Sequence, residues 1–310
     1  YVGYLGMHGD YAPNIKTNEC DVLIAVGMRF DDRVTGDVSR YAKQAKVIHI
    51  DIDAAELNKI IKADVPVHAD AKEALKLLTE LVQEKQHPVW LNEFTEAKKT
   101  EVETLQKSSE LLFSSELKMD EVIKILSEIT KGEAVVVTDV GQHQMMTARY
   151  YNYNKSKSNI TSGGLGTMGF ALPAAIGAKF GTPDKTVIAV IGDGGFQMTL
   201  QELGTILQSK VEVKIIILNN RFLGMVRQWQ DLFFEKRYSF TEIMSPDFVA
   251  LSKAYSIESS RIEERTHLKE ALLEMVNHQG SYLLEVMVAK EENVFPMVPT
   301  GASVSEIRLN

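Results

Sequence analysis

The chain has 310 residues, of which 45% are hydrophobic and 25% charged, and its net charge is −8. This composition is typical of a soluble globular protein with room for two domains. It argues against a membrane protein or a nucleic-acid binder, which would show a long apolar run or a basic face. The single cysteine, Cys20, excludes an internal disulfide, so we expect a cytoplasmic location. The chain starts at Tyr1 rather than methionine, and we expect it to be a piece of a longer protein.

The hydrophobic pattern predicts an α/β fold with two doubly wound, mostly parallel-sheet (Rossmann-like) domains, the first one incomplete. The first domain is placed at residues 1–85, a polar and partly helical linker at 86–116, and the second domain at 117–310. In the first domain, strands are expected at 21–27, 46–53 and 65–68, and helices at 37–45 and 71–83. In the second, strands are expected at 134–139, 186–191, 213–218 and 282–288, and helices at 118–130, 199–208, 248–255 and 267–276.

Charged residues gather where the first two predicted strands end. The loop at 27–36 crowds two arginines and two aspartates directly after a strand. Arginine binds phosphate well through its bidentate geometry, so this loop is a candidate phosphate contact. Asp51 and Asp53 end the second strand, where an acid can bond a ribose or adenine edge. The alternative is that they cap a helix over 54–61, and the sequence weighs the two evenly.

Two stretches of the second domain suggest a bound ligand. Gln142 and His143 follow the tip of the strand at 134–139, where they could donate to a phosphate, although a lone histidine is more often a filler. The segment 162–177 holds five glycines among small residues, which indicates close approach of the backbone to a flat ligand. Packing of a glycine-rich helix against the sheet is the alternative.

The strongest signal lies at 191–220. Two buried strands end in Gly192-Asp193-Gly194-Gly195 and in Asn219-Asn220, so Asp193 and Asn220 should lie side by side at the carboxyl edge of a parallel sheet. A carboxylate, an amide oxygen and a nearby backbone carbonyl, for which Phe222 is our choice, form a donor set that suits Mg²⁺. The following helix, expected at 199–208, would point its N-terminus at a phosphate. The prediction is a magnesium-diphosphate clamp.

The spacing of GDG and Asn-Asn resembles the thiamine diphosphate signature. The segments Gly6-Met-His-Gly9, Gly27-Met-Arg-Phe-Asp-Asp-Arg-Val-Thr-Gly36 and His49-Ile-Asp-Ile-Asp53 resemble the central domain of acetolactate synthase (acetohydroxyacid synthase) catalytic subunits, and Gly141-Gln-His-Gln-Met145 also matches that family. The resemblance covers nearly the whole chain, as the C-terminal portion of such a subunit. It implies thiamine diphosphate, Mg²⁺ and a largely structural FAD as cofactors.

The resemblance assigns roles residue by residue. It places Gly166 and Met168 at the aminopyrimidine, with Met168 holding the cofactor in a bent shape, and Trp229 at the mouth of the substrate channel. Met225 is also placed at the reacting centre. The implied diphosphate and cofactor contacts are Gln142, His143, Gly192, Asp193, Gly194, Gly195, Asn220, Leu223 and Gly224. The implied FAD contacts are Gly6, Met7, His8, Gly27, Arg29, Asp31, Arg33, Val34, Asp51, Ile52 and Asp70.

The implied activity is decarboxylation of pyruvate on thiamine diphosphate and ligation to a second 2-keto acid, pyruvate or 2-oxobutyrate, in branched-chain amino acid biosynthesis. The family acts as a homodimer or tetramer with shared active sites and sometimes with a small regulatory subunit. Its activating glutamate comes from an N-terminal domain that this chain does not match, so we expect the chain alone to be inactive. The alternatives are another thiamine diphosphate carboligase or decarboxylase, such as catabolic acetolactate synthase or glyoxylate carboligase, and a non-catalytic nucleotide-binding module.

Overall fold

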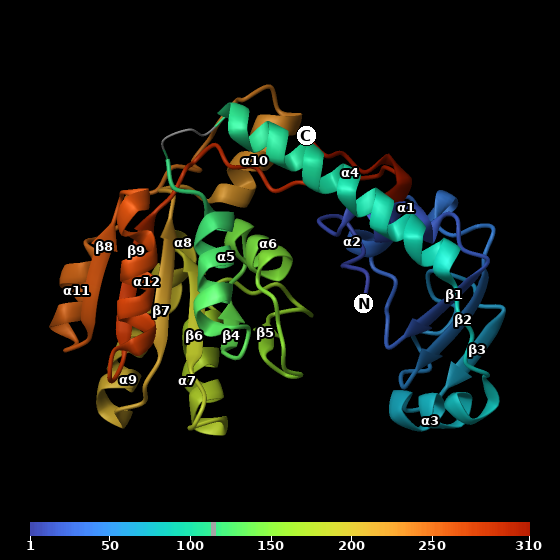
Figure 1. Ribbon diagram of the computed structural model, residues 1–310, viewed down its shortest axis with the longest axis horizontal. Helices are drawn as coiled ribbons and strands as arrows, with labels where there is room; N and C mark the ends of the chain where they lie inside the picture. The colour runs from blue at the N-terminus through green and yellow to red at the C-terminus, as the bar shows by residue number, and fades with distance from the viewer. Residues whose placement is uncertain (113–115) are drawn as a thin grey trace. The chain divides into compact units, whose positions relative to one another are not determined.

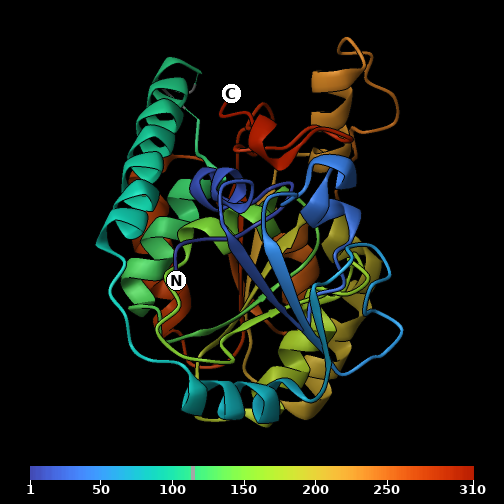
Figure 2. The ribbon, with the colours of Figure 1, turned by 90° about the vertical axis from the view of Figure 1, so that its right-hand side faces the viewer.

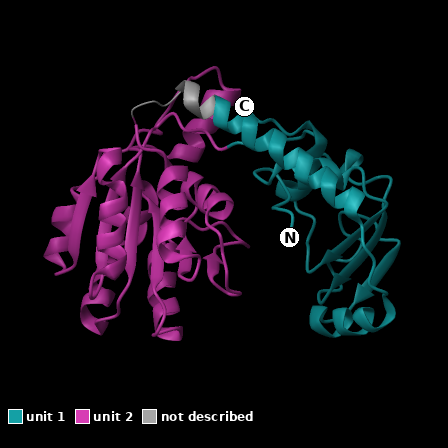
Figure 3. Cartoon of the chain, viewed as in Figure 1, with its two compact units in different colours: residues 1–112, 295–310 teal, residues 113–294 magenta. Residues whose placement is uncertain are grey.

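The structure, a computed structural model, describes residues 1–112 and 116–310 and contains two compact units (Figure 3). Unit 1 comprises residues 1–112 and 295–310, and unit 2 comprises residues 113–294. The division along the chain therefore falls inside the predicted linker. The division also differs from the predicted domains at the C-terminal end, because residues 295–310 pack with the first unit.

Unit 1 is built on a small parallel sheet whose strands lie in the order β1-β2-β3 (Figures 1 and 2). The strands are β1 (Val22–Val26), β2 (Lys46–Asp51) and β3 (Val65–His68). The helices are α1 (Tyr11–Thr17), α2 (Asp32–Thr35), α3 (Ala71–Leu81) and α4 (Pro88–Leu112), with short 3-10 turns η1 (Val38–Arg40) and η4 (Val304–Glu306). The three strands and α3 confirm the sequence prediction for this part of the chain.

Two helices predicted in unit 1 are wrong. Residues 37–45 hold only the short turn η1 and further turns, and residues 54–61 form turns rather than a helix. In each segment one residue has a left-handed backbone, Ala42 at φ 47° and Asn58 at φ 61°, which ends any right-handed helix there. Asp51 and Asp53 still act locally, because they accept the backbone N–H groups of Asp53 and Ala55.

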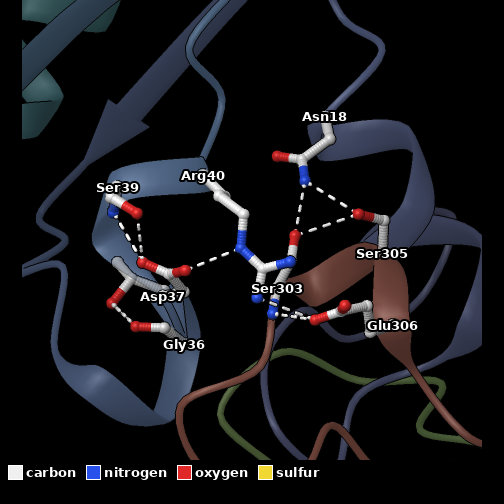
Figure 4. Close-up of polar contacts among 9 residues, drawn as sticks. Asn18, Gly36, Asp37, Ser39, Arg40, Ser303, Ser305 and Glu306 are labelled. Carbon is white, nitrogen blue, oxygen red and sulfur yellow. Dashed lines mark hydrogen bonds and ion pairs between the residues drawn. The ribbon is translucent and has the colours of Figure 1, made fainter.

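The predicted linker helix lies against unit 1. In α4, Glu93 is 2.6 Å from Lys16 Nζ and Glu101 accepts the backbone N–H of Tyr11, so both residues hold α1. The C-terminal segment is attached through Arg40, which bonds Asp37 at 2.6 Å and Glu306 at 2.8 Å (Figure 4). Asn18 also donates to the hydroxyls of Ser303 and Ser305 (Figure 4).

Unit 2 is a six-stranded parallel sheet with helices on both faces (Figure 1). Its strands are β4 (Val135–Thr138), β5 (Asn159–Thr161), β6 (Val187–Gly192), β7 (Lys214–Asn219), β8 (Glu258–Ile262) and β9 (Tyr282–Met287). Its helices are α5 (Met119–Thr130), α6 (Gln142–Tyr150), α7 (Ala171–Gly181), α8 (Asp193–Thr199), α9 (Leu203–Ser209), α10 (Gly224–Phe233), α11 (Phe248–Ala254) and α12 (Leu268–Asn277), with 3-10 turns η2 (Leu200–Glu202) and η3 (Arg265–His267).

Both faces of this sheet are buried, which explains the continuous apolar runs of its strands. Alternate residues of each strand enter two separate cores: Val136, Ile188 and Leu284 pack with α5 and α12, whereas Val137 and Ile217 belong to the core on the other face. The predicted doubly wound, parallel α/β architecture is thereby confirmed. No helix in residues 1–112 or 116–310 is long and apolar enough to span a membrane.

The strand order creates one distinctive crevice in unit 2. The order is β5-β4-β6-β7-β9-β8, so after β4 the chain first moves to one side of that strand and then returns to its other side with β6. Ligands of open α/β sheets bind at such a reversal, outside the carboxyl ends of the strands. The ends of β4 and β6 are therefore the expected binding edge.

Candidate functional site

A pocket lies at this edge of unit 2, where β4, β6 and β7 end. Its walls come from the ends of β6 and β7, the residues that follow the three strands, the starts of α5 and α10, and one residue of the glycine-rich loop. The lining residues are Met119, Val140, Gly141, Gln142, His143, Met168, Gly192, Asp193, Gly194, Gly195, Leu218, Asn220, Phe222, Leu223, Gly224, Met225 and Val226. Most of the residues predicted for the diphosphate clamp are thus brought together.

The GDG segment begins a helix rather than preceding one. α8 starts at Asp193, directly after β6, so the predicted helix over 199–208 is wrong at its N-terminal boundary and is divided into α8, η2 and α9. Gly195 lies inside α8 against the carboxylate of Asp139, and a Cβ atom there would be 2.4 Å from Asp139 Oδ1. The glycine therefore lets the end of β4 approach α8.

The two asparagines at the end of β7, Asn219 and Asn220, each stabilise the turn that follows. Asn219 Oδ1 accepts the backbone N–H of Arg221 at 2.9 Å, and Asn220 Oδ1 accepts that of Phe222 at 3.0 Å. Arg221 has a left-handed backbone with φ 61°, which these side-chain bonds help to hold. Asn220 lines the pocket, whereas Asn219 does not.

Asp193 is a buried acid without a cationic partner among the described residues. Its exposed fraction is 1%, and its carboxylate accepts only a long bond of 3.4 Å from the Ser245 hydroxyl among side chains. Burial raises the pKa of Asp193 to about 7, while nearby backbone N–H groups and Ser245 act in the opposite direction. A divalent cation would offset the cost of ionising this carboxyl group.

The donors around Asp193 fit a hard cation. The Asn220 amide oxygen has a second lone pair beyond the one used by Phe222, and Phe222 itself also lines the pocket. Oxygen ligands in small number are typical of Mg²⁺, which keeps water and phosphate in its other positions. The described residues contain no cluster of three or more His, Cys, Asp or Glu side chains, so any such site depends on amide and backbone oxygens.

His143 and Gln142 begin α6 and differ in what they offer. His143 is buried, its Nε2 has no hydrogen-bond partner within the described residues, and burial lowers its pKa to about 4, so the imidazole is neutral. Gln142 Nε2 donates to Gln228 Oε1 at 3.0 Å and to the Glu292 carbonyl at 2.9 Å. Both N–H groups of Gln142 thus bind protein acceptors, and His143 is the side chain with an unused polar atom.

Asp139 supports the glycine-rich loop and was not recognised in the sequence. Its two carboxylate oxygens accept the backbone N–H groups of Gly169 at 3.0 Å and Ala171 at 2.9 Å, at the start of α7. This anchor fixes the loop whose Met168 lines the pocket, whereas Gly166 is exposed and lies outside the lining. An acid directly after a buried strand was the signal that could have identified it.

Of the two residues predicted on α10, Met225 and Trp229, only Met225 reaches the pocket. Met225 lines the pocket, but Trp229 lies one turn further along, outside the lining. The Trp229 ring packs on Phe233, with ring centroids 4.8 Å apart.

The sequence analysis also missed Glu292, which is buried. Its carboxylate accepts the Met119 N–H at 2.8 Å, and its backbone carbonyl accepts from Gln142 Nε2. It therefore connects two walls of the pocket.

The residues predicted for FAD lie in unit 1. Arg29 and Arg33 have side chains 54% and 63% exposed and pair with Asp31 at 2.9 Å and Asp32 at 3.5 Å, so both remain within reach of a ligand. The remaining predicted contacts have local structural roles. Three involve backbone groups: the Met7 N–H donates to the Arg33 carbonyl, the Gly27 N–H donates to the Ile50 carbonyl, and the Ile52 carbonyl bonds His68 Nε2. Gly6 packs on Arg33 and Val34, the side chains of Asp31 and Asp70 cap α2 and α3, and the Asp51 carboxylate accepts the Asp53 N–H. His8 lies beside Met7 and is half-buried.

Comparison with protein families decides the family of the chain. The model described as "Thiamine pyrophosphate enzyme, C-terminal TPP binding domain" matches residues 139–286, from Asp139 to Val286 in β9. The model described as "Thiamine pyrophosphate enzyme, central domain" matches residues 1–78. The chain belongs to the thiamine pyrophosphate enzymes. Thiamine pyrophosphate is the compound also called thiamine diphosphate, and the C-terminal match contains the pocket residues from Val140 to Val226.

Curated relatives of this member of the thiamine pyrophosphate enzyme family include acetolactate synthase large subunits. The chain is 43% identical over 308 residues to that of Lactococcus lactis subsp. lactis, covering 99% of this chain and 52% of the relative. It is 44% identical over 308 residues to the isozyme 2 large subunit of Escherichia coli K12, covering 99% and 55%. It is 42% identical over 312 residues to the probable acetolactate synthase large subunit of Methanocaldococcus jannaschii, covering 99% and 52%. The chain therefore spans about half the length of the curated relatives that it matches.

Proposed function

We propose that the chain is the C-terminal part of an acetolactate synthase catalytic subunit and that its unit 2 binds thiamine diphosphate through Mg²⁺. The observation that carries the proposal is the meeting of Asp193 and Asn220 in one pocket at the ends of adjacent strands. The names of the relatives, acetolactate synthase large subunits, give the reaction. It is the decarboxylation of pyruvate and ligation to a second 2-keto acid, pyruvate or 2-oxobutyrate.

The proposed division of roles follows from the chemistry of the pocket. Asp193, the Asn220 amide oxygen and the Phe222 carbonyl would hold Mg²⁺, and the unused Nε2 of His143 would bond a diphosphate oxygen. Met168 and Met225 give the pocket an apolar wall that excludes water. When bound, thiamine diphosphate supplies the nucleophilic carbon and the electron sink of the reaction.

We further propose that unit 1 contributes to an FAD site. Arg29 and Arg33 would meet the phosphates, because their guanidinium groups are exposed on a loop after β1. The activating glutamate of this family belongs to a part of the subunit that this chain does not match. We therefore propose that activity requires the rest of the subunit and a second copy, that a small regulatory subunit takes part, and that the enzyme acts in the cytoplasm.

Calorimetric titration tests the clamp. Thiamine diphosphate is titrated into the chain with and without Mg²⁺, and into two variants, Asp193→Ala and Asp184→Ala. Asp184 is an exposed acid in the loop before β6, at the opposite end of that strand, and serves as the matched control. We expect Mg²⁺-dependent binding in wild type and in Asp184→Ala, and none in Asp193→Ala. Equal binding by Asp193→Ala would refute the clamp.

The reaction is tested on the full-length subunit. Acetolactate formed from pyruvate is measured for the full-length protein, with and without Asp193→Ala, and for the 310-residue chain alone. We expect activity only in the full-length wild-type protein. Acetolactate produced by the chain alone would contradict the proposed need for the remainder of the subunit. Bound flavin, read from visible absorbance, separates an FAD-containing enzyme from a flavin-free carboligase.

A further inference from the structure

The strand β9, which lies between β7 and the edge strand β8, carries one charged residue in an otherwise apolar run. Glu285 stands between Leu284 and Val286, which are fully buried, and is itself only 1% exposed. It lies outside the pocket lining. A buried carboxylate is costly unless its oxygens are paired, so its partners indicate why it is tolerated.

Both carboxylate oxygens of Glu285 have a partner on a neighbouring strand. Oε1 accepts from Asn219 Nδ2 of β7 at 2.7 Å, and Oε2 accepts from Arg261 Nε of β8 at 2.7 Å. β9 lies between these two strands, and Arg261 is directly in register with Glu285. Arg261 in turn bonds Asp247, the residue that caps α11. A polar connection therefore runs across three strands and ends at Asn219.

Asn219 is the residue before the proposed metal ligand. Its amide nitrogen faces Glu285, and its oxygen accepts the backbone N–H of Arg221. A carboxylate can only accept hydrogen bonds, so it forces the nitrogen of the Asn219 amide toward itself and the oxygen toward Arg221. Glu285 on β9 thus sets the orientation of this amide. The amide in turn holds the turn that contains Asn220 and Phe222.

We propose that Glu285 is a positioning residue for the metal-binding turn and acts through Asn219. This inference rests on the proposed function, because the turn matters only if Asn220 and Phe222 hold Mg²⁺. Groups that orient metal ligands without touching the metal tune affinity strongly. Glu285→Gln is the informative variant: it keeps the size of the side chain, but its amide can also donate and so permits the flipped orientation of Asn219.

The first measurement needs no cofactor. Amide hydrogen exchange of residues 221–222 is compared in wild type, Glu285→Gln and Arg265→Gln. The control Arg265→Gln removes an ion pair of the same unit, 3.0 Å from Glu121, that does not contact the turn. We expect exchange to be about tenfold faster in Glu285→Gln and unchanged in the control. Exchange rates within twofold of wild type in Glu285→Gln would overturn the proposal.

The second measurement is the Mg²⁺ concentration that gives half-maximal thiamine diphosphate binding. We expect it to rise about tenfold in Glu285→Gln, with full binding restored at high Mg²⁺. The variant Asn219→Ala and the double variant should show the same rise, because Glu285 acts through Asn219. Additive effects would refute that route. If Asp193→Ala binds normally, the proposed function fails; if it does not bind while Glu285→Gln matches wild type, only the positioning role fails.

Discussion

Asn220 Nδ2 lies 3.4 Å from Gln142 Oε1, and this contact joins the end of β7 to the first residue of α6. Gly224 lies against both side chains. The Gln142 amide then continues through Gln228 to the backbone of Val294. The proposed metal ligand is thus the first member of a buried amide network, and the network requires a residue without a side chain at position 224.

Substitution of Gly224 tests this network. A Cβ atom there would be 2.1 Å from Gln142 Oε1 and 2.8 Å from Asn220 Nδ2, so Gly224→Ala must displace one of them. We expect it to lower the free energy of unfolding by about 1–3 kcal/mol. We also expect it to weaken thiamine diphosphate binding at least about tenfold, since 1.4 kcal/mol is tenfold in affinity. Urea denaturation and calorimetry measure the two effects.

Gly177→Ala is the control for this substitution. Gly177 is exposed on α7, and no atom lies within 4 Å of the position that its Cβ would take. We expect the free energy of unfolding to be unchanged or to rise by up to about 1 kcal/mol, because alanine suits a helix better than glycine. A loss of stability in Gly177→Ala equal to that in Gly224→Ala would show that the network is not the cause.

Glu292 predicts a pH dependence of stability. Burial, and next the charge of Asp120, raise the pKa of Glu292 from 4.5 to about 8. An acid with a raised pKa in the folded state keeps its proton when the unfolded chain has lost it, so the free energy of unfolding falls as pH rises from about 4.5 to about 8. We expect Glu292→Gln to remove this part of the decline. Urea denaturation at pH 5 and pH 8 measures it.

The neighbouring Glu291 provides the control for that prediction. Its side chain is 47% exposed and pairs with Arg227 at 3.2 Å. We expect Glu291→Gln to retain the wild-type difference in stability between pH 5 and pH 8. A difference that persists in Glu292→Gln would assign the pH dependence to other groups.

Asp139 predicts a local effect on the glycine-rich loop. Asp139→Ala leaves the N–H groups of Gly169 and Ala171 without an acceptor, and each buried unpaired donor costs about 1–3 kcal/mol. We expect a lower free energy of unfolding and faster amide exchange at residues 166–171 than in wild type. Wild-type exchange rates in this loop would contradict the anchoring role. Asp184→Ala, an exposed acid outside the loop, serves as the control.

Removal of the metal should affect unit 2 alone. At concentrations about 100 times the dissociation constant, a ligand that binds only the folded state stabilises it by about 2.7 kcal/mol. With thiamine diphosphate present, we expect chelation of Mg²⁺ to accelerate amide exchange around the ends of β6 and β7. Residues of β1–β3 should keep their rates, since the pocket lies within unit 2. A uniform change in both units would contradict this assignment.

Local sequence patterns predicted those parts of the site that depend on strand ends. Asp193 and Asn220 could be placed together because both follow buried apolar runs, and adjacent parallel strands end at one edge. The continuous apolar runs of the strands also indicated a parallel sheet that is covered on both faces. In these cases a pattern within one short stretch of the sequence was enough to make the prediction.

Other features depend on partners that are distant in the sequence. Gln142 is held by Gln228 and the Glu292 carbonyl, 86 and 150 residues away, and no local pattern predicts such a network. The helix expected at 54–61 fails because of the left-handed backbone at Asn58, which propensity does not reveal. The start of α8 at Asp193 was missed because glycines normally disfavour helix interiors.

The return of residues 295–310 to unit 1 has a consequence for biosynthesis. Unit 2 consists of one continuous stretch, whereas unit 1 is assembled from the first 112 residues and the last 16. Domains fold as units while the chain leaves the ribosome. Unit 2 can therefore complete its sheet during translation. Unit 1 can form its contacts to residues 295–310 only after these residues have been synthesised. Asn18 and Arg40 then bond Ser303 and Glu306.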